Sequence, residues 1–185
     1  MKKSLAAIFL AALVFSASAA PQKAGAPEEP KYALSFNYLN SANKAVPLEK
    51  QVPLLDAKVS FLPGWKKEIG YEYPGVASPI RFKQGEPIRL VVRGIERDID
   101  PTNLISIIKL KIKKDRRFNP FVTASGMHVT GQQPSQQSIA YTVKEYGESS
   151  LEINPTNISP GEYVVYISNY SMDQRFFFGV DSASE

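Results

Sequence analysis

A run of cationic residues between positions 109 and 117 is the feature of this sequence that most directly suggests chemistry. Its members are Lys109, Lys111, Lys113, Lys114, Arg116 and Arg117. The lysines alternate with apolar residues at 108, 110 and 112, and successive residues of a strand face opposite sides, so the pattern predicts an amphipathic strand. Its lysines would stand ~6.6 Å apart as a cationic ladder suited to an anionic partner. The alternative is a solvated face whose lysines discourage edge-to-edge pairing.

The anionic partners that fit such a ladder are a phosphate-rich or lipopolysaccharide surface, an acidic glycan and an acidic envelope protein. Nucleic acid is disfavoured, because the ladder is not interleaved with aromatic side chains on which bases would stack. The net charge is +4, and it falls to +2 once a leader with two lysines and no acidic residue is removed. A nearly neutral chain lacks the long-range attraction that nucleic-acid-binding proteins use.

A second candidate surface lies in the segment from residue 63 to residue 85, which is rich in proline and glycine. This length is too great for an ordinary hairpin loop, and long loops inside compact domains are often functional. The segment holds Trp65, the only tryptophan, together with Tyr71 and Tyr73. Exposed aromatic rings stack on sugar faces or anchor protein interfaces. The alternative is that these three rings cover one end of the fold and fill its core.

Oxygen-bearing side chains gather at Glu96, Asp98, Asp100 and Asn103, and calcium prefers oxygen ligands. The segment lacks the glycine and the terminal glutamate of an EF-hand loop, and Asp-Pro-Thr-Asn at 100–103 is common turn chemistry. We therefore predict a turn with helix-cap character, no metal site and no cofactor.

The residue types needed for catalysis are sparse. His128 is the only histidine, there is no cysteine, and neither H-E-x-x-H nor G-x-S-x-G occurs. Two carboxylates could hydrolyse a glycoside, but sequence alone does not pair them in space. The prediction is therefore a protein that is not an enzyme, and a carboxylate-based hydrolase is the least favoured alternative.

The first 19 residues have the features of a secretory signal peptide. Lys2 and Lys3 precede an apolar run from Leu5 to Phe15, and small residues lead to a cleavage site after Ala19. The run is shorter than the ~20 residues of a membrane-spanning helix, so we predict export to the periplasm or beyond, with no transmembrane span. Residues 20–31 are rich in proline and predict a flexible tether, followed by one domain over 32–185.

The elements that must position these side chains are strands. Apolar residues alternate with polar ones over 32–38, 57–61, 88–92 and 139–143, and short strands bounded by turn residues follow over 149–154, 162–168 and 175–180. About eight or nine strands predict an antiparallel, immunoglobulin-like β-sandwich, and a closed β-barrel is the alternative. Both faces of the strand from Tyr163 to Ile167 are apolar, so it should be covered on both sides.

The C-terminal third carries the string KEYGESSLEINPTNISPGEYVVYI and then RFFFGVD. This ending resembles that of uncharacterised exported bacterial β-sandwich proteins, in which a Tyr-Gly-Glu-Ser strand leads to a Pro-Gly-Glu-Tyr turn and an aromatic-rich Phe-Gly-Val-Asp strand. The resemblance covers ~40 residues and implies the fold. It implies no activity.

Taken together, these features predict a non-catalytic binding or assembly module of the bacterial envelope that contacts a protein or an anionic partner. The alternative is a carbohydrate-binding module that uses the loop aromatics as a stacking platform. The sequence specifies neither the identity of the partner nor the oligomeric state.

Overall fold

The computed structural model describes residues 27–56, 66–96, 98–125, 128–132, 138–168 and 174–183, which form three β-sheets. Sheet A has the order β12 (Tyr141–Tyr146), β13 (Ser150–Pro155), β7 (Leu90–Arg93), β1 (Phe36–Leu39), β2 (Ala45–Pro47). Sheet B has the order β3 (Glu49–Gln51), β15 (Arg175–Asp181), β14 (Gly161–Ile167), β8 (Ile105–Lys109), and β6 (Arg81–Lys83) also pairs with β15. Sheet C has the order β11 (His128–Gln132), β10 (Arg116–Ser125), β5 (Lys66–Pro74), β4 (Leu54–Asp56), and β9 (Lys111–Lys113) also pairs with β10.

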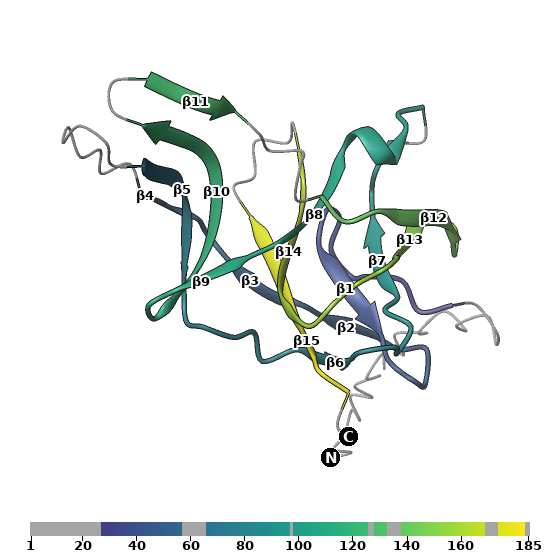
Figure 1. Cartoon of the computed structure of the whole chain (residues 1–185). Coiled ribbons are helices and arrows are strands. Elements are labelled where there is room, and N and C mark those ends of the chain that lie inside the picture. The colour runs from purple at the N-terminus through teal and green to yellow at the C-terminus, as the bar shows by residue number, and fades with distance from the viewer. Residues whose placement is uncertain are drawn as a thin grey trace, which may run out of the picture.

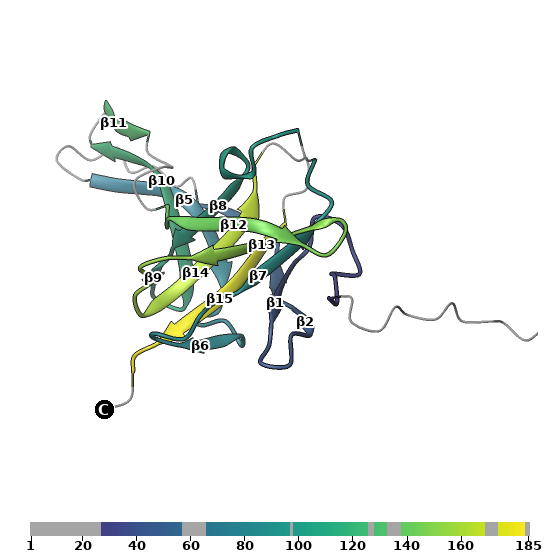
Figure 2. The same ribbon diagram turned by 90° about the vertical axis from the view of Figure 1, so that its right-hand side faces the viewer.

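The strand pairs are antiparallel except for β6 with β15, and each sheet is an open path of strands. The predicted antiparallel β-sandwich is therefore confirmed, and a closed barrel is not the architecture. Figure 1 shows sheet B between sheet A and sheet C, and Figure 2 shows β11 with the adjoining ends of β5 and β10 projecting from the body. The strands are shorter and more numerous than the eight or nine predicted, because turns and bulges divide the alternating segments.

The main hydrophobic core lies between sheets A and B. Phe36 on β1 meets Phe176 on β15 edge to face, with ring centroids 5.5 Å apart. Tyr163 and Val165 on β14 belong to this core, whereas Val164 between them belongs to a second core on the other face of sheet B. The prediction that this strand is covered on both faces is confirmed.

The second core joins sheet C to sheet B. The rings of Tyr73 on β5 and Phe177 on β15 lie 4.7 Å apart, and both side chains are fully buried. Arg117 on β10 donates to both carboxylate oxygens of Glu49 on β3, at 2.8 and 2.9 Å. Its guanidinium carbon also lies 4.4 Å from the centre of the Phe177 ring. An ion pair and an aromatic contact therefore hold sheet C, the third layer, against sheet B. The sequence did not predict this third layer.

The predicted loop over 63–85 is wrong where the structure describes it, because residues 66–74 form β5. The strand pairs with β10 along its length, and the alternation of Ile69, Tyr71 and Tyr73 is that of a half-buried strand. Gly70 is needed at this position, since a Cβ would overlap the Asn119 carbonyl oxygen on β10. The predicted strand over 57–61 and Trp65 lie outside the described residues.

The end of the predicted tether is anchored to sheet A. Glu29 accepts hydrogen bonds from the backbone nitrogen of Ser149, at 2.8 Å, and from its hydroxyl, at 2.9 Å. Burial alone would raise the pKa of Glu29, but the hydrogen bonds from Ser149 outweigh it and lower that pKa. Residues 27–31 are therefore not a free tether, since Pro30 is also buried.

Candidate functional site

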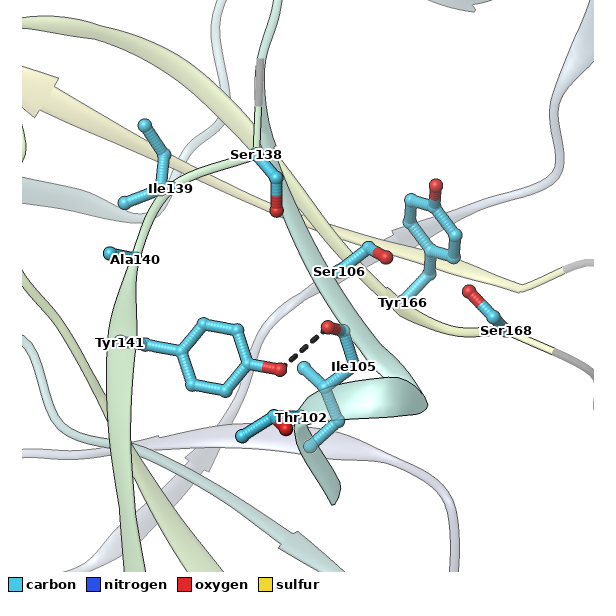
Figure 3. Close-up of a pocket in the computed structure, with 9 residues that line it drawn as sticks. All are labelled: Thr102, Ile105, Ser106, Ser138, Ile139, Ala140, Tyr141, Tyr166 and Ser168. Atoms are coloured by element: carbon cyan, nitrogen blue, oxygen red, sulfur yellow. Dashed lines mark hydrogen bonds between the residues drawn. The ribbon is translucent and has the colours of Figure 1, made fainter. Parts of the chain in front are cut away.

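A hollow of about 490 Å³ opens beside β8, the edge strand of sheet B, where the chain crosses toward sheet A (Figure 3). Six of its lining residues carry hydroxyl groups: Thr102, Ser106, Ser138, Tyr141, Tyr166 and Ser168. The others are Ile105, Ile139 and Ala140, so none of the described residues that line it is charged. We call this site the hydroxyl hollow. It brings together segments separated by up to 66 positions in the sequence.

The wall of the hydroxyl hollow is formed by hydrogen bonds to the outer edge of β8. The Ile139 backbone nitrogen donates to the Ile107 carbonyl at 2.7 Å, and the Tyr141 hydroxyl donates to the Ile105 carbonyl at 2.6 Å (Figure 3). Burial raises the pKa of Tyr141 to about 12, with a further contribution from the Asp100 carboxylate. The Tyr141 hydroxyl therefore stays protonated at neutral pH and acts as a donor to the strand edge.

Three serine hydroxyls in the hydroxyl hollow are not used by the fold. Within the described ranges, the side chains of Ser106, Ser138 and Ser168 make no hydrogen bond, and Ser106 and Ser168 are half-buried. Figure 3 shows them on separate segments around the same space. Each hydroxyl can donate one hydrogen bond and accept others. The arrangement is therefore suited to a ligand rich in hydroxyl groups.

The predicted cationic ladder is divided between two sheets and largely neutralised. On sheet C the pairs are Lys111 with Glu68, Lys113 with Asp56 at 3.2 Å, and Arg116 with Glu72 at 3.1 Å. Lys109 lies on β8 in sheet B and donates to the Ser159 hydroxyl at 2.7 Å. Lys114 lies in the exposed turn between β9 and β10, with a positive φ of 58°. Within the described residues, the ladder is therefore a set of surface ion pairs with two lysines, Lys109 and Lys114, that have no carboxylate partner.

Two residues proposed as binding groups are instead buried in the fold. Arg117 and Tyr73 are opposite each other in the β10–β5 register and face sheet B, and neither side chain reaches the surface. Tyr71 is half-buried against Phe121, with ring centroids 5.0 Å apart. Assigning Arg117 to an anionic partner and Tyr73 to an exposed aromatic surface was therefore wrong, because a third sheet covers this face.

A second hollow, of about 520 Å³, lies on the outer face of sheet C. Paired charges line it, together with Lys114, Asp115 and two exposed leucines, Leu54 and Leu55. Leu54 is 49% exposed and Leu55 is 62% exposed. We call it the mixed-charge hollow. Its apolar rim and its charges of both signs are typical of an interaction surface more than of a buried ligand site.

The acidic segment after β7 is a turn. Asp100 accepts hydrogen bonds from the backbone nitrogen and the hydroxyl of Thr102, at 2.9 and 2.7 Å, and so caps the 3₁₀ turn η1 (Pro101–Asn103). The predicted turn with helix-cap character is confirmed. The described part of the chain holds no group of three side chains suited to a metal ion. His128 begins β11.

No helix in the described ranges is long and apolar enough to cross a membrane. No protein-family model matches the chain, and no curated protein shows significant similarity to it. The resemblance of the C-terminal third to exported β-sandwich proteins therefore stays a prediction.

Proposed function

We propose that this protein is an exported, non-catalytic binding module that binds a saccharide in the hydroxyl hollow. The observation that carries the proposal is an uncharged hollow lined by six hydroxyl groups, three of them serine hydroxyls free of hydrogen bonds within the described residues. Saccharides match such a site, because their hydroxyl groups exchange hydrogen bonds with it while their C–H faces contact rings and aliphatic side chains.

Binding without reaction is the role that this lining supports. General acid–base or nucleophilic catalysis needs a titrating group or an activated nucleophile beside the substrate. The described residues that line the hydroxyl hollow supply neither a carboxylate nor an imidazole, and Tyr141 is held in its protonated form. Export to the bacterial envelope is supported by the leader over residues 1–19.

Replacing Ser106 and Ser138 together by valine should weaken saccharide binding at least ~10-fold while leaving the fold intact. Valine has nearly the shape of serine plus one methyl group, and a site built to hydrogen-bond a ligand loses affinity when its polar groups are removed. Isothermal titration of the mature protein against a panel of envelope and plant oligosaccharides measures the effect. The matched control is Thr142→Val, which removes an exposed hydroxyl on β12 outside the hollow. Equal affinity of both variants and the wild type would contradict the proposal.

An anionic surface of the cell envelope is the second candidate partner, and the mixed-charge hollow favours it. Leu54 and Leu55 are exposed beside Lys114, which makes no ion pair within the described residues. Apolar insertion combined with a basic residue is a common mode of attachment to anionic lipids. We expect phosphatidylglycerol vesicles to retain the wild type at low salt, and Lys114→Gln with Leu55→Ser to lose that retention. Failure of the wild type to bind these vesicles would remove this candidate.

A further inference from the structure

Arg175 contacts a residue that lines the hydroxyl hollow, and it has no acidic partner within the described residues. It begins β15, and its guanidinium carbon lies 4.3 Å from the centre of the Tyr166 ring, which lines the hollow. It donates to the neighbouring Gln174 carbonyl at 3.3 Å and lies within hydrogen-bonding reach of the Tyr73 hydroxyl, and neither group is a counter-charge. The guanidinium group has five N–H donors, so others remain for a ligand.

Most of the other described arginines form ion pairs with carboxylates. Four of them are paired with carboxylates: Arg81, Arg89, Arg116 and Arg117. Within the described ranges, only Arg175 and Arg93 have no acidic partner, and Arg93 is exposed at the end of β7. Arg175 is half-buried, and a half-buried cation without a counter-charge costs more than an exposed one. Among the described arginines, Arg175 would therefore be stabilised most by an anionic ligand.

Two further polar groups lie near Arg175. Tyr73 is fully buried, and burial raises the pKa of its hydroxyl. Arg175 opposes that rise through its charge and a side-chain hydrogen bond, so the guanidinium lies beside the Tyr73 hydroxyl. Gln51, opposite Arg175 in the β3–β15 register, has a buried side-chain oxygen without a partner within the described residues. Neither group gives Arg175 a counter-charge, which an anionic ligand would supply.

We infer that the saccharide of the hydroxyl hollow is an acidic one, such as a chain containing uronic acid, and that Arg175 binds its carboxylate. This inference rests on the function proposed above and specifies its ligand class. Stacking on the Tyr166 ring holds one face of the guanidinium and leaves its N–H edge for a bidentate pair with a carboxylate. Serine hydroxyls then bind the sugar hydroxyls, and the cation provides selectivity for the charged sugar over its neutral form.

The test compares the same oligosaccharide with and without its charge. Isothermal titration of the mature protein with oligogalacturonate and with its methyl ester should give an affinity at least ~10-fold higher for the acid. Arg175→Gln should abolish that preference while retaining the affinity for the ester. Arg175→Lys keeps the charge but not the bidentate geometry and should keep part of the preference. Arg93→Gln is the matched control and should behave as the wild type.

The possible failures are distinguishable. Equal affinity of the wild type for the acid and the ester would overturn the role of Arg175 and leave saccharide binding in place. Retention of the full preference by Arg175→Gln would also overturn it. Absence of binding to any saccharide would end both proposals. Because the comparison of acid with ester uses the wild type, the test does not depend on how well the variants fold.

Discussion

Replacing Arg117 by methionine should destabilise the protein by about 3 to 5 kcal/mol, because the change leaves the Glu49 carboxylate without its buried partner. The lost contacts are two hydrogen bonds to Glu49, one hydrogen bond to the Pro74 carbonyl at 3.1 Å, and the stacking of the guanidinium on the Phe177 ring. The contacts with Glu49 and Phe177 join sheet C to sheet B, so the loss should appear in urea unfolding followed by tyrosine fluorescence and by far-ultraviolet circular dichroism.

Two further variants separate burial from charge. Arg116→Met removes the neighbouring arginine, whose side chain is 42% exposed and pairs with Glu72 on the outer face, and should cost less than about 1 kcal/mol. The double variant Arg117→Met with Glu49→Met should recover most of the loss, since hydrophobic residues often replace a buried ion pair without penalty. Equal losses of stability for Arg116→Met and Arg117→Met would contradict the conclusion that the buried contacts of Arg117 hold sheet C against sheet B.

The contrast between these two neighbours shows where sequence reasoning reaches its limit. Alternation correctly assigned the strand around Val92, and a short apolar run bounded by turn residues correctly assigned the strand around Val164. The same rule placed Arg117 in the turn that follows the lysine strand, and it does not reveal what lies against any face of the chain. The burial of Arg117 depends on β3, whose Glu49 is 68 positions away in the sequence.

The strand β5 and the hydroxyl hollow were missed for different reasons. Ile69, Tyr71 and Tyr73 carry a strand alternation, but the density of proline and glycine around them favoured a loop. The hydroxyl hollow has no local signal at all, because its serines and tyrosines are ordinary residues in three separate segments. Only the crossing of the chain from β8 toward β12 brings those segments together, and that crossing is set by sheet topology.

Replacing Glu152 by glutamine should cost about 2 to 3 kcal/mol at neutral pH and progressively less in acid. The Glu152 side chain is 2% exposed and accepts hydrogen bonds from Arg89 at 2.8 and 3.0 Å, and the Lys144 ammonium lies 3.0 Å from it. The hydrogen bonds from Arg89 are the largest cause of the lowered pKa of Glu152. A lowered pKa in the folded state means that the ionised carboxylate stabilises the fold.

The sign of the pH dependence follows from that direction. Stability from Glu152 is fully present above the pKa of an unfolded glutamate, ~4.3, and is lost as the pH falls through the lower pKa of the folded state. Urea unfolding of the wild type and Glu152→Gln at pH 7 and at about pH 2 should therefore give a difference that shrinks in acid. Glu145→Gln, at an exposed position on β12, should give no such trend. A difference that stays constant with pH would show that the charge of Glu152 contributes nothing, and that its shape alone stabilises sheet A.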